Sequence, residues 1–409
     1  MKEEDIPDIT GEYCHHNPER IKRRDFFRVS AASLAGIALS RSLFAQEKAD
    51  AHKQEPAIPP EIKTNVDEVK NIPRGKTSLP GRYPGKVVKL NTVDASRKGT
   101  LNPKKIREAV ERGMRELTGK KSMKKAWQEF VQPKDVVGIK VNPIGGKLLS
   151  TKPEVVDVII DCLLNDGLPR ENIIIWDRRL FHLIEAGYTQ ERFPGIKILG
   201  TEMKGQNGEF FDEKGELWSR DNIDRESLPY FAEVEGKYNE QTLPYMINEG
   251  NQSFFSKIVT EKCTKIINVP ILKNAGSSVT ICFKNLSYGS MSNTGRLHKL
   301  WPKSVAEPLA FPCLRDKVVL NIVDGLQACY EGGPGANANY IWDANLMLFG
   351  TDPVAVDAVG YEFILKERMK RGIQQLEDKK AQDFLKIAAA LGLGEARMDK
   401  IELKEIQMA

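Results

Sequence analysis

Residues 135–177 read DVVGIKVNPIGGKLLSTKPEVVDVIIDCLLNDGLPRENIIIWD and carry the clearest signal of the fold. The β-branched run from Asp135 to Val141 predicts a buried strand, and the run from Asn172 to Asp177 predicts a second one. Thr151 and Glu154 form a capping box with a proline in the first helical turn. The helix that follows has a predicted buried stripe of Val155, Val156, Ile159, Ile160 and Leu163. This order of elements indicates a βαβ unit with parallel strands.

The same alternation continues along most of the chain. Further strands are predicted at residues 86–90, 195–199, 265–269, 317–323 and 400–406, and helices from Asn102-Pro103, near 278–286, from Asp352-Pro353 and over 379–391. We therefore expect an α/β fold, in which helices cover both faces of a mostly parallel sheet. A polar stretch near residues 201–250 breaks the alternation and is interpreted as an insertion at the rim. Residues 85–409 are expected to form a single domain.

The amino terminus has the features of an export signal. Residues 22–28 read KRRDFFR, and the apolar run at 29–40 is about twelve residues long, whereas a membrane span needs roughly 20. The adjacent Arg23 and Arg24 resemble the twin-arginine translocation consensus. We therefore expect a signal peptide over 1–45, with the twin-arginine (Tat) translocase as partner during export. The protein would be periplasmic or otherwise exported, with no permanent membrane span unless the signal stays uncleaved.

Composition narrows the classes of partner and cofactor. The chain has 61 basic and 56 acidic residues, and this mild net charge of +5 disfavours a nucleic-acid partner. Cys14 lies in the signal, and the other cysteines have no C-x-x-C spacing, so we do not expect an iron–sulfur cluster. Residues 46–84 contain several prolines and are predicted to be a linker or a wrapping arm.

Candidate ligand-binding residues lie near the ends of two predicted strands. In open α/β sheets, ligands bind beyond the carboxyl ends of the strands. Lys140 and Asn142 end the strand at 135–141, beside Gly145 and Gly146. The strand at 265–269 continues through Lys273 and Asn274 into the predicted helix near 278–286, whose free N–H groups would suit an anion. Lys284 and Asn285 follow within that helix.

Four further side chains are candidates for proton transfer or metal binding. His298 lies in a loop, Asp324 follows the strand at 317–323, and Glu331 precedes a glycine-rich segment. We take these three as candidate catalytic residues, although a loop histidine or an Asp-Gly turn is often structural. Asp324 and Asp357 are candidate ligands of a divalent metal. The cofactor is otherwise unknown.

Together these segments resemble a family of bacterial and archaeal proteins known as domain-of-unknown-function family 362. The resemblance runs from about residue 86 to 406 and rests on residues 140–142, 269–273, 279–286, His298, 323–325, 331–335 and 352–357. Many members carry a histidine shortly after the lysine of the Leu-Lys motif, where this chain has Asn274 and Ala275. The resemblance implies the fold but no activity.

The leading functional hypothesis is an exported enzyme with a basic pocket for an anionic small molecule or cofactor. Lys140, Lys273 and Lys284 would line the pocket, with His298, Asp324 and Glu331 near them. Hydrolysis, isomerisation and redox chemistry all remain open as the reaction. The alternative is a periplasmic ligand- or cofactor-binding protein without turnover. The enzyme hypothesis requires a carboxylate or a histidine within hydrogen-bond reach of the lysines.

Overall fold

The computed structural model describes residues 61–205, 207–234, 250–276, 278–373 and 381–408. The predicted signal at 1–45 lies outside the described residues. No helix in the described ranges has the length and hydrophobicity needed to cross a membrane. The strands and helices discussed below all belong to the compact unit that begins at residue 62.

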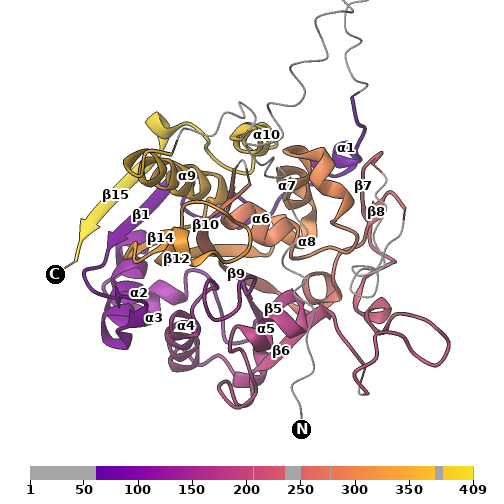
Figure 1. The fold of residues 1–409 in the computed structure, drawn as a ribbon, viewed down its shortest axis with the longest axis horizontal. Helices are drawn as coiled ribbons and strands as arrows, with labels where there is room; N and C mark the ends of the chain where they lie inside the picture. The colour runs from indigo at the N-terminus through magenta and orange to yellow at the C-terminus, as the bar shows by residue number, and fades with distance from the viewer. Residues whose placement is uncertain (1–60, 206, 235–249, 277, 374–380, 409) are drawn as a thin grey trace, which may run out of the picture. The chain divides into compact units, whose positions relative to one another are not determined.

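A large mixed sheet forms the centre of this unit (Figure 1). Its main path runs β15-β1-β14-β12-β9-β4-β5-β6. The bounds are β1 Lys86–Asn91, β4 Val137–Val141, β5 Ile173–Arg179, β6 Lys197–Glu202, β9 Lys265–Val269, β12 Val318–Cys329, β14 Leu346–Gly350 and β15 Glu402–Gln407. Neighbours on this path are parallel except where β14 pairs with β1 and β12. The predicted α/β class with a mostly parallel sheet is confirmed.

Strand β14 is an element that the sequence patterns did not reveal. All five of its residues are buried, and it follows β12 after the short strand β13 Ile341–Trp342. It pairs antiparallel with β12 from Asn321 opposite Gly350 to Gly325 opposite Leu346. A short buried run has no alternation that separates a strand from a helix segment, so only its partners identify it.

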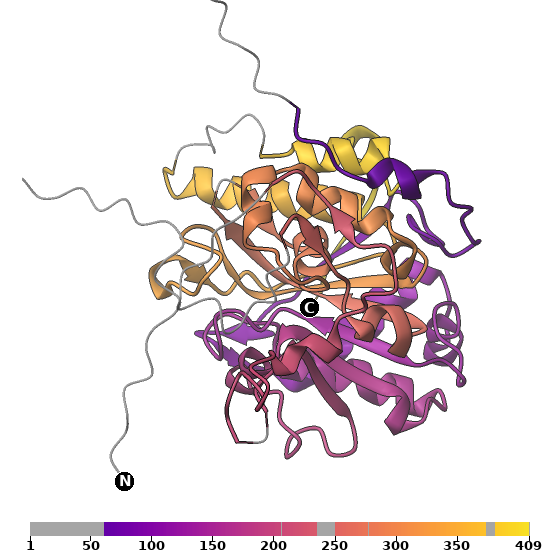
Figure 2. The same ribbon diagram turned by 90° about the vertical axis from the view of Figure 1, so that its right-hand side faces the viewer.

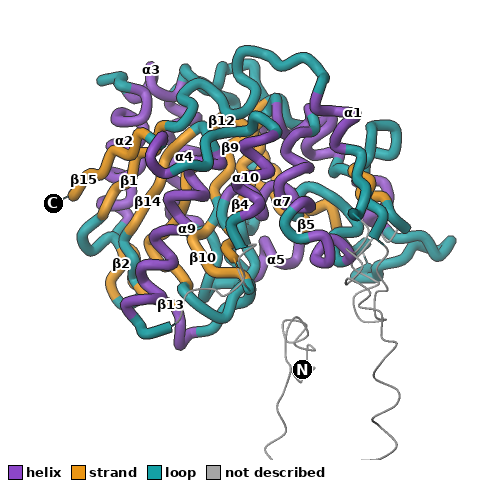
Figure 3. Tube along the Cα trace, turned by 90° about the horizontal axis from the view of Figure 1, so that it is seen from above, coloured by secondary structure: helices purple, strands orange, loops and turns teal. Residues whose placement is uncertain are grey.

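Helices cover both faces of the sheet (Figures 1 and 2). One face packs against α2 Pro103–Thr118, α3 Met123–Trp127 and α4 Pro153–Asn165. The other packs against α6 Cys282–Ser287, α7 Lys303–Ala306, α9 Pro353–Lys370 and α10 Asp383–Ala390. Successive residues of one strand enter opposite cores, as Ile175 and Trp176 do. Figure 3 shows the strands side by side among these helices.

The helix starts predicted at Asn102-Pro103, Thr151–Glu154 and Asp352-Pro353 are confirmed, but only two of the three have the predicted side-chain cap. The Asn102 side chain accepts from Lys105 N at the start of α2, and Asp352 accepts from Val354 N and Ala355 N at the start of α9. The predicted capping box of α4 does not form. Thr151 Oγ1 instead accepts from Asn142 N and donates to Val269 O, which ties α4 to two strands.

The predicted helix near 278–286 is also wrong in its first half. Residues Ile271–Ala275 form β10, which turns back as β11 Ser278–Thr280. Strand β10 also pairs parallel with β12, and this long-range partner favours the hairpin over a helix. Helix α6 begins only at Cys282. The helix amino terminus that was expected beside Gly276 to bind an anion is therefore absent there.

The polar insertion and the segment before the sheet each add small elements. Within the described part of 201–253 there is a two-stranded sheet of β7 Tyr230–Phe231 and β8 Gln252–Ser253. Residues 66–70 form the short helix α1 Val66–Lys70. Asn65 Nδ2 donates to Pro229 O at 2.9 Å, so this segment contacts the insertion.

Candidate functional site

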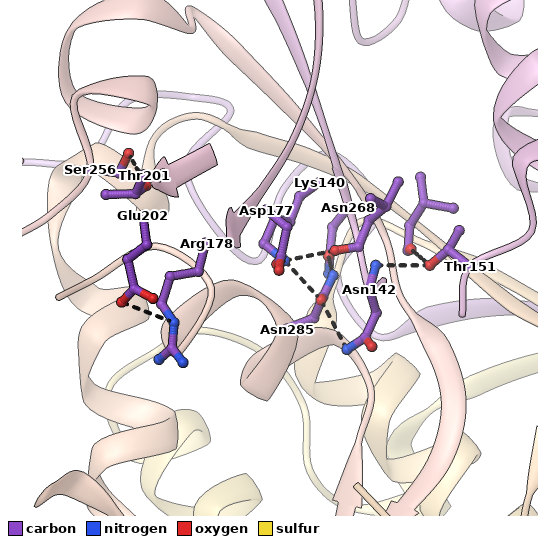
Figure 4. Close-up of polar contacts among 12 residues, drawn as sticks. Lys140, Asn142, Thr151, Asp177, Arg178, Thr201, Glu202, Ser256, Asn268 and Asn285 are labelled. Carbon is purple, nitrogen blue, oxygen red and sulfur yellow. Dashed lines mark hydrogen bonds and ion pairs between the residues drawn. The ribbon is translucent and has the colours of Figure 1, made fainter. Parts of the chain in front are cut away.

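A buried ion pair lies at the carboxyl ends of β4 and β5 (Figure 4). Lys140 is fully buried, and its Nζ donates to Asp177 Oδ1 at 2.5 Å, to Asn285 Oδ1 at 2.9 Å and to Val141 O at 2.7 Å. Three donated hydrogen bonds require an ammonium group, since a neutral amine has only two N–H groups. Lys140 is therefore positively charged, with Asp177 as its counter-ion.

The two partners affect each other's ionisation. Burial alone would raise the pKa of Asp177, but the adjacent Lys140 charge and its hydrogen bond outweigh burial, so the pKa of Asp177 is lowered. Burial lowers the pKa of Lys140, and Asp177 opposes that effect. The ring of Trp176 lies 5.4 Å from Lys140 Nζ and adds a cation–π contact.

Gly289 makes room for the Lys140 side chain. A Cβ atom built on Gly289 would lie 2.3 Å from Lys140 Cε and 2.3 Å from Asn285 O, far inside normal contact distance. The residue after Tyr288 can therefore only be glycine if Lys140 is to keep this path to Asp177.

A chain of buried carboxamides extends from the ion pair. Asn285 Oδ1 accepts from Lys140, so Asn285 Nδ2 must be the donor to Asn268 Oδ1, at 2.8 Å. Asn268 Nδ2 in turn donates to Asn321 Oδ1 at 2.9 Å. On the other side, Asn142 Nδ2 donates to Asn285 Oδ1 at 3.3 Å. Because a lysine ammonium can only donate, it fixes the orientation of every amide in the chain.

Lys273 continues this network from strand β10. It is fully buried, and its Nζ donates to Asn142 Oδ1 at 3.1 Å and to Ile144 O at 2.9 Å. Neither acceptor is charged. Burial lowers the pKa of Lys273 to about 7, with nearby Lys284 and Lys140 acting in the same direction and Cys329 and Asp177 against it.

Two arginines follow Asp177 at the end of β5. Arg179 Nε lies 2.8 Å and Arg178 Nε 3.5 Å from the buried carboxylate of Glu202, and Arg178 also donates to Thr294 Oγ1. Both arginines are half-buried. The described residues of this cluster thus bring four basic groups, with Lys140 and Lys273, against the two carboxylates Asp177 and Glu202. Such a balance favours an anionic partner.

Lys284 and His298 both contact the ring of Tyr288. Lys284 Nζ lies 5.7 Å from the ring centroid of Tyr288 and 5.8 Å from that of Trp301. The exposed His298 stacks its ring on Tyr288, with centroids 5.0 Å apart, and its Nδ1 lies 3.1 Å from Gly295 O. Loss of water from that ring face, together with the Lys284 charge, lowers the pKa of His298 to about 4.

Asp324 and Asp357 hold helices and are not gathered into a metal site. Asp324 Oδ2 accepts from Lys152 N at the start of α4, and Oδ1 from Leu326 N. Asp357 accepts from Cys282 N and Phe283 N, so it caps α6. Burial raises the pKa of Asp324 to about 6 and that of Asp357 to about 7. Among the described residues, no three His, Cys, Asp or Glu side chains form a group that could hold a metal ion. These residues do not fit a divalent metal.

Glu331 pairs with a cation outside the lysine network. Its carboxylate accepts from Arg368 of α9, whose guanidinium also donates to Tyr330 O at 3.0 Å. Asn274 links this loop to β10, because Gly333 N donates to Asn274 Oδ1 at 3.0 Å. A Cβ on Gly333 would lie 1.8 Å from Asn274 O, so this close approach requires glycine. Asn274 thus positions the loop, and its amide donates to Gly276 O rather than toward Lys273.

Comparison with known proteins places this site in a family. The family model described as a domain of unknown function, DUF362, matches residues 137–362, which include the whole lysine network. The chain belongs to the DUF362 family. Comparison with curated proteins gives no match.

Two solved structures share distant similarity with this DUF362 protein. A protein from Thermotoga maritima is 10% identical with a TM-score of 0.35, over 66% of this chain and 59% of that one. The lactate racemase apoprotein from Thermoanaerobacterium thermosaccharolyticum is 12% identical with a TM-score of 0.34, over 64% of this chain and 55% of that one. The match spans less than two thirds of either structure's length.

The sequence patterns selected the lysines and two of the asparagines of the network but not its carboxylate, Asp177, or the neighbouring arginines. Lys140, Asn142, Lys273 and Asn285 are hydrogen-bonded together as a group. The carboxylate within reach of Lys140 is Asp177, however, and not Asp324 as the sequence suggested. Asp177 is the last residue of a predicted strand in this DUF362 chain, and the two arginines directly follow it. The strand-end rule that selected Lys140 would have found them had it been applied to β5 as well.

Proposed function

We propose that this DUF362 protein is an enzyme that acts on an anionic small molecule at the carboxyl edge of β4, β5 and β10, with Lys273 as its reactive group. The observation that carries the proposal is the Lys273 amine, which is buried and donates to two uncharged acceptors, while the carboxylate of Asp177 pairs with Lys140 instead. A buried lysine beside other cations is activated as a base or nucleophile, because its neutral form is favoured.

The basic groups around the amine support an anionic partner. Arg178 and Lys284 are half-buried and therefore closer to solvent than Lys273. An anion that reaches them would arrive beside the amine, since the Lys284 charge already affects the pKa of Lys273. Catalysis would then use positioned cations for binding and the amine for chemistry.

A thermal-denaturation screen of the full-length chain tests the proposal. Carboxylates, phosphate and sulfate are added singly, and a ligand at 100 times its Kd should stabilise the protein by about 2.7 kcal/mol. The response should weaken in Lys284→Met and persist in Lys317→Met. Lys317 is a half-buried lysine that precedes the first residue of β12, whereas Lys273 is paired with Cys329, the last residue of that strand. If no anion stabilises the wild type, the proposed function is wrong. Binding without any Lys273-dependent reaction would favour a ligand-binding protein without turnover.

We also propose that the chain is exported through the twin-arginine pathway, guided by Arg23 and Arg24 in the KRRDFFR segment. The experiment is cell fractionation of the wild type and the double variant Arg23→Lys/Arg24→Lys. Export predicts a periplasmic wild type and a cytoplasmic variant. A wild type that stays in the cytoplasm would contradict the proposal.

A further inference from the structure

The hydrogen bonds of Lys273 match those of a neutral amine. A neutral lysine amine has two N–H groups and one lone pair, and Nζ donates two hydrogen bonds, to Asn142 Oδ1 and Ile144 O. Lys140, by contrast, makes three. Because both acceptors of Lys273 are uncharged, no counter-ion in its hydrogen-bonding shell holds a proton on the amine. In the neutral amine neither hydrogen bond uses the lone pair, which is available for bond formation.

A buried hydroxyl group on the neighbouring strand β11 has no hydrogen-bond partner among the described residues. Thr280 is directly opposite Lys273 in the antiparallel pair of β10 and β11, so both side chains project from the same face. Thr280 is only 4% exposed, and among the described residues its Oγ1 has no hydrogen-bond partner. Buried hydroxyls are normally paired, so the unpaired Thr280 hydroxyl is free to bind an oxygen atom of a ligand on the face that it shares with Lys273.

We propose that Lys273 forms an imine with the carbonyl group of a 2-oxo acid, while the Thr280 hydroxyl hydrogen-bonds the carbonyl oxygen. This inference rests on the proposed function and names its substrate class. The lone pair of Nζ attacks the carbonyl carbon, and one amine proton moves to the oxygen to give a carbinolamine. The C–O bond then breaks, the hydroxyl leaves as water with a proton taken from solvent, and the C=N bond forms as a protonated imine that keeps the second amine proton. No oxidant or reductant is needed.

The surrounding groups suit each stage of this reaction. A protonated imine keeps one N–H, which can donate to Asn142 Oδ1, while Ile144 O is released. Ile144, Gly145 and Gly146 are half-buried, so this side of the amine faces a segment that reaches the surface. The carboxylate of a 2-oxo acid lies next to its carbonyl and would meet the half-buried Lys284. An uncharged aldehyde lacks that second interaction.

Borohydride trapping tests the imine directly. Full-length protein is incubated at pH 7 with pyruvate, glyoxylate or propionaldehyde and sodium cyanoborohydride, followed by intact-mass and peptide mass spectrometry. We expect one adduct, heavier by the oxo acid less one oxygen atom, on the peptide that contains Lys273. The oxo acids should react faster than propionaldehyde. Thr280→Val should slow trapping by about tenfold, the value of one hydrogen bond, and Thr280→Ser should restore it.

Lys317 provides a matched control within the same chain. Like Lys273, it donates to two uncharged oxygens, here Val259 O and Thr260 O, and burial lowers its pKa, yet it directly precedes the first residue of β12. Trapping at Lys317 or at exposed lysines as fast as at Lys273 would overturn the inference. Lys273→Met should abolish the adduct, and circular dichroism checks that it folds. Anion stabilisation without an adduct would refute the imine alone. The absence of both anion stabilisation and an adduct would refute the proposed function as well.

Discussion

The Lys140–Asp177 pair allows a quantitative test of the buried network. The two side chains are 0% and 7% exposed, and Nζ and Oδ1 are 2.5 Å apart. Removing one partner of such a pair leaves a buried charge uncompensated and costs about 3–5 kcal/mol. We therefore expect Asp177→Leu and Lys140→Met each to lower the free energy of unfolding by about that amount.

The double variant should be far more stable than the two single losses suggest. It removes both charges together, and apolar replacements of similar volume are often neutral. Asn285 Oδ1 keeps its hydrogen bond from Asn142, but Val141 O loses its donor, so a cost of about 1–3 kcal/mol remains. The two sites should thus be coupled by about 3 kcal/mol or more, whereas independent sites add within a few tenths.

Equilibrium urea unfolding of the wild type, the two single variants and the double variant measures this coupling energy. Circular dichroism and tryptophan fluorescence are followed together to check that the transition is two-state. The exposed pair Lys70–Asp67 is the control, and the coupling energy measured in the same way between these two residues should be at most about 1 kcal/mol. In Asp177→Leu the pKa of Lys140 should fall further, so the deficit should shrink as the pH rises from 7 to 10. Additive single losses, with coupling below about 1 kcal/mol, would refute this account of the pair.

Three further perturbations follow from the same geometry. The pKa of Lys273 is about 7 in the folded protein and about 10.4 in the unfolded chain, so between these pH values the unfolded chain binds one more proton. The free energy of unfolding of the wild type should therefore rise by about 1.4 kcal/mol per pH unit relative to Lys273→Met. Urea titrations at several pH values measure this slope. Gly289→Ala should cost about 1–3 kcal/mol, seen as a lower denaturation midpoint, because its Cβ overlaps Lys140 Cε. Asp357→Ala leaves the N–H groups of Cys282 and Phe283 unpaired, so it should cost about 1–3 kcal/mol for each, with early hydrogen exchange in α6.

The elements that sequence patterns predicted well are those with a local cause. The stripe from Val155 to Leu163 defines α4 through its own spacing, and Asn102 and Asp352 cap the helices that they precede. The prediction failed at 278–286, where the outcome depends on distant partners. Strand β10 is held by β12, and α6 is capped by Asp357, 75 residues further along the chain. No local pattern contains that information.

The same limit explains which candidate residues were misassigned. An aspartate beside a glycine or a helix start has the same local sequence whether it binds a ligand or accepts backbone N–H groups. Asp324 accepts from Lys152 N, 172 residues away, and this contact ties it to the start of α4. Lys140 and Lys273 were both candidate ligand-binding residues, and the structure joins them through Asn142 and Asn285. Their different acceptors, Asp177 for Lys140 and Asn142 for Lys273, come from other strands.

The buried ion pair and the proposed reactive amine depend on each other. Asp177 raises the pKa of Lys273 and Lys140 lowers it, so the pair acts on Lys273 as two opposing charges. Asp177 bonds Lys140 at 2.5 Å and is not among the hydrogen-bond acceptors of Lys273, which are both neutral. If Asp177 instead paired with Lys273, that amine would be held as an ammonium and would lose its nucleophilic lone pair. The choice of partner by Asp177 therefore determines which lysine is structural and which can react.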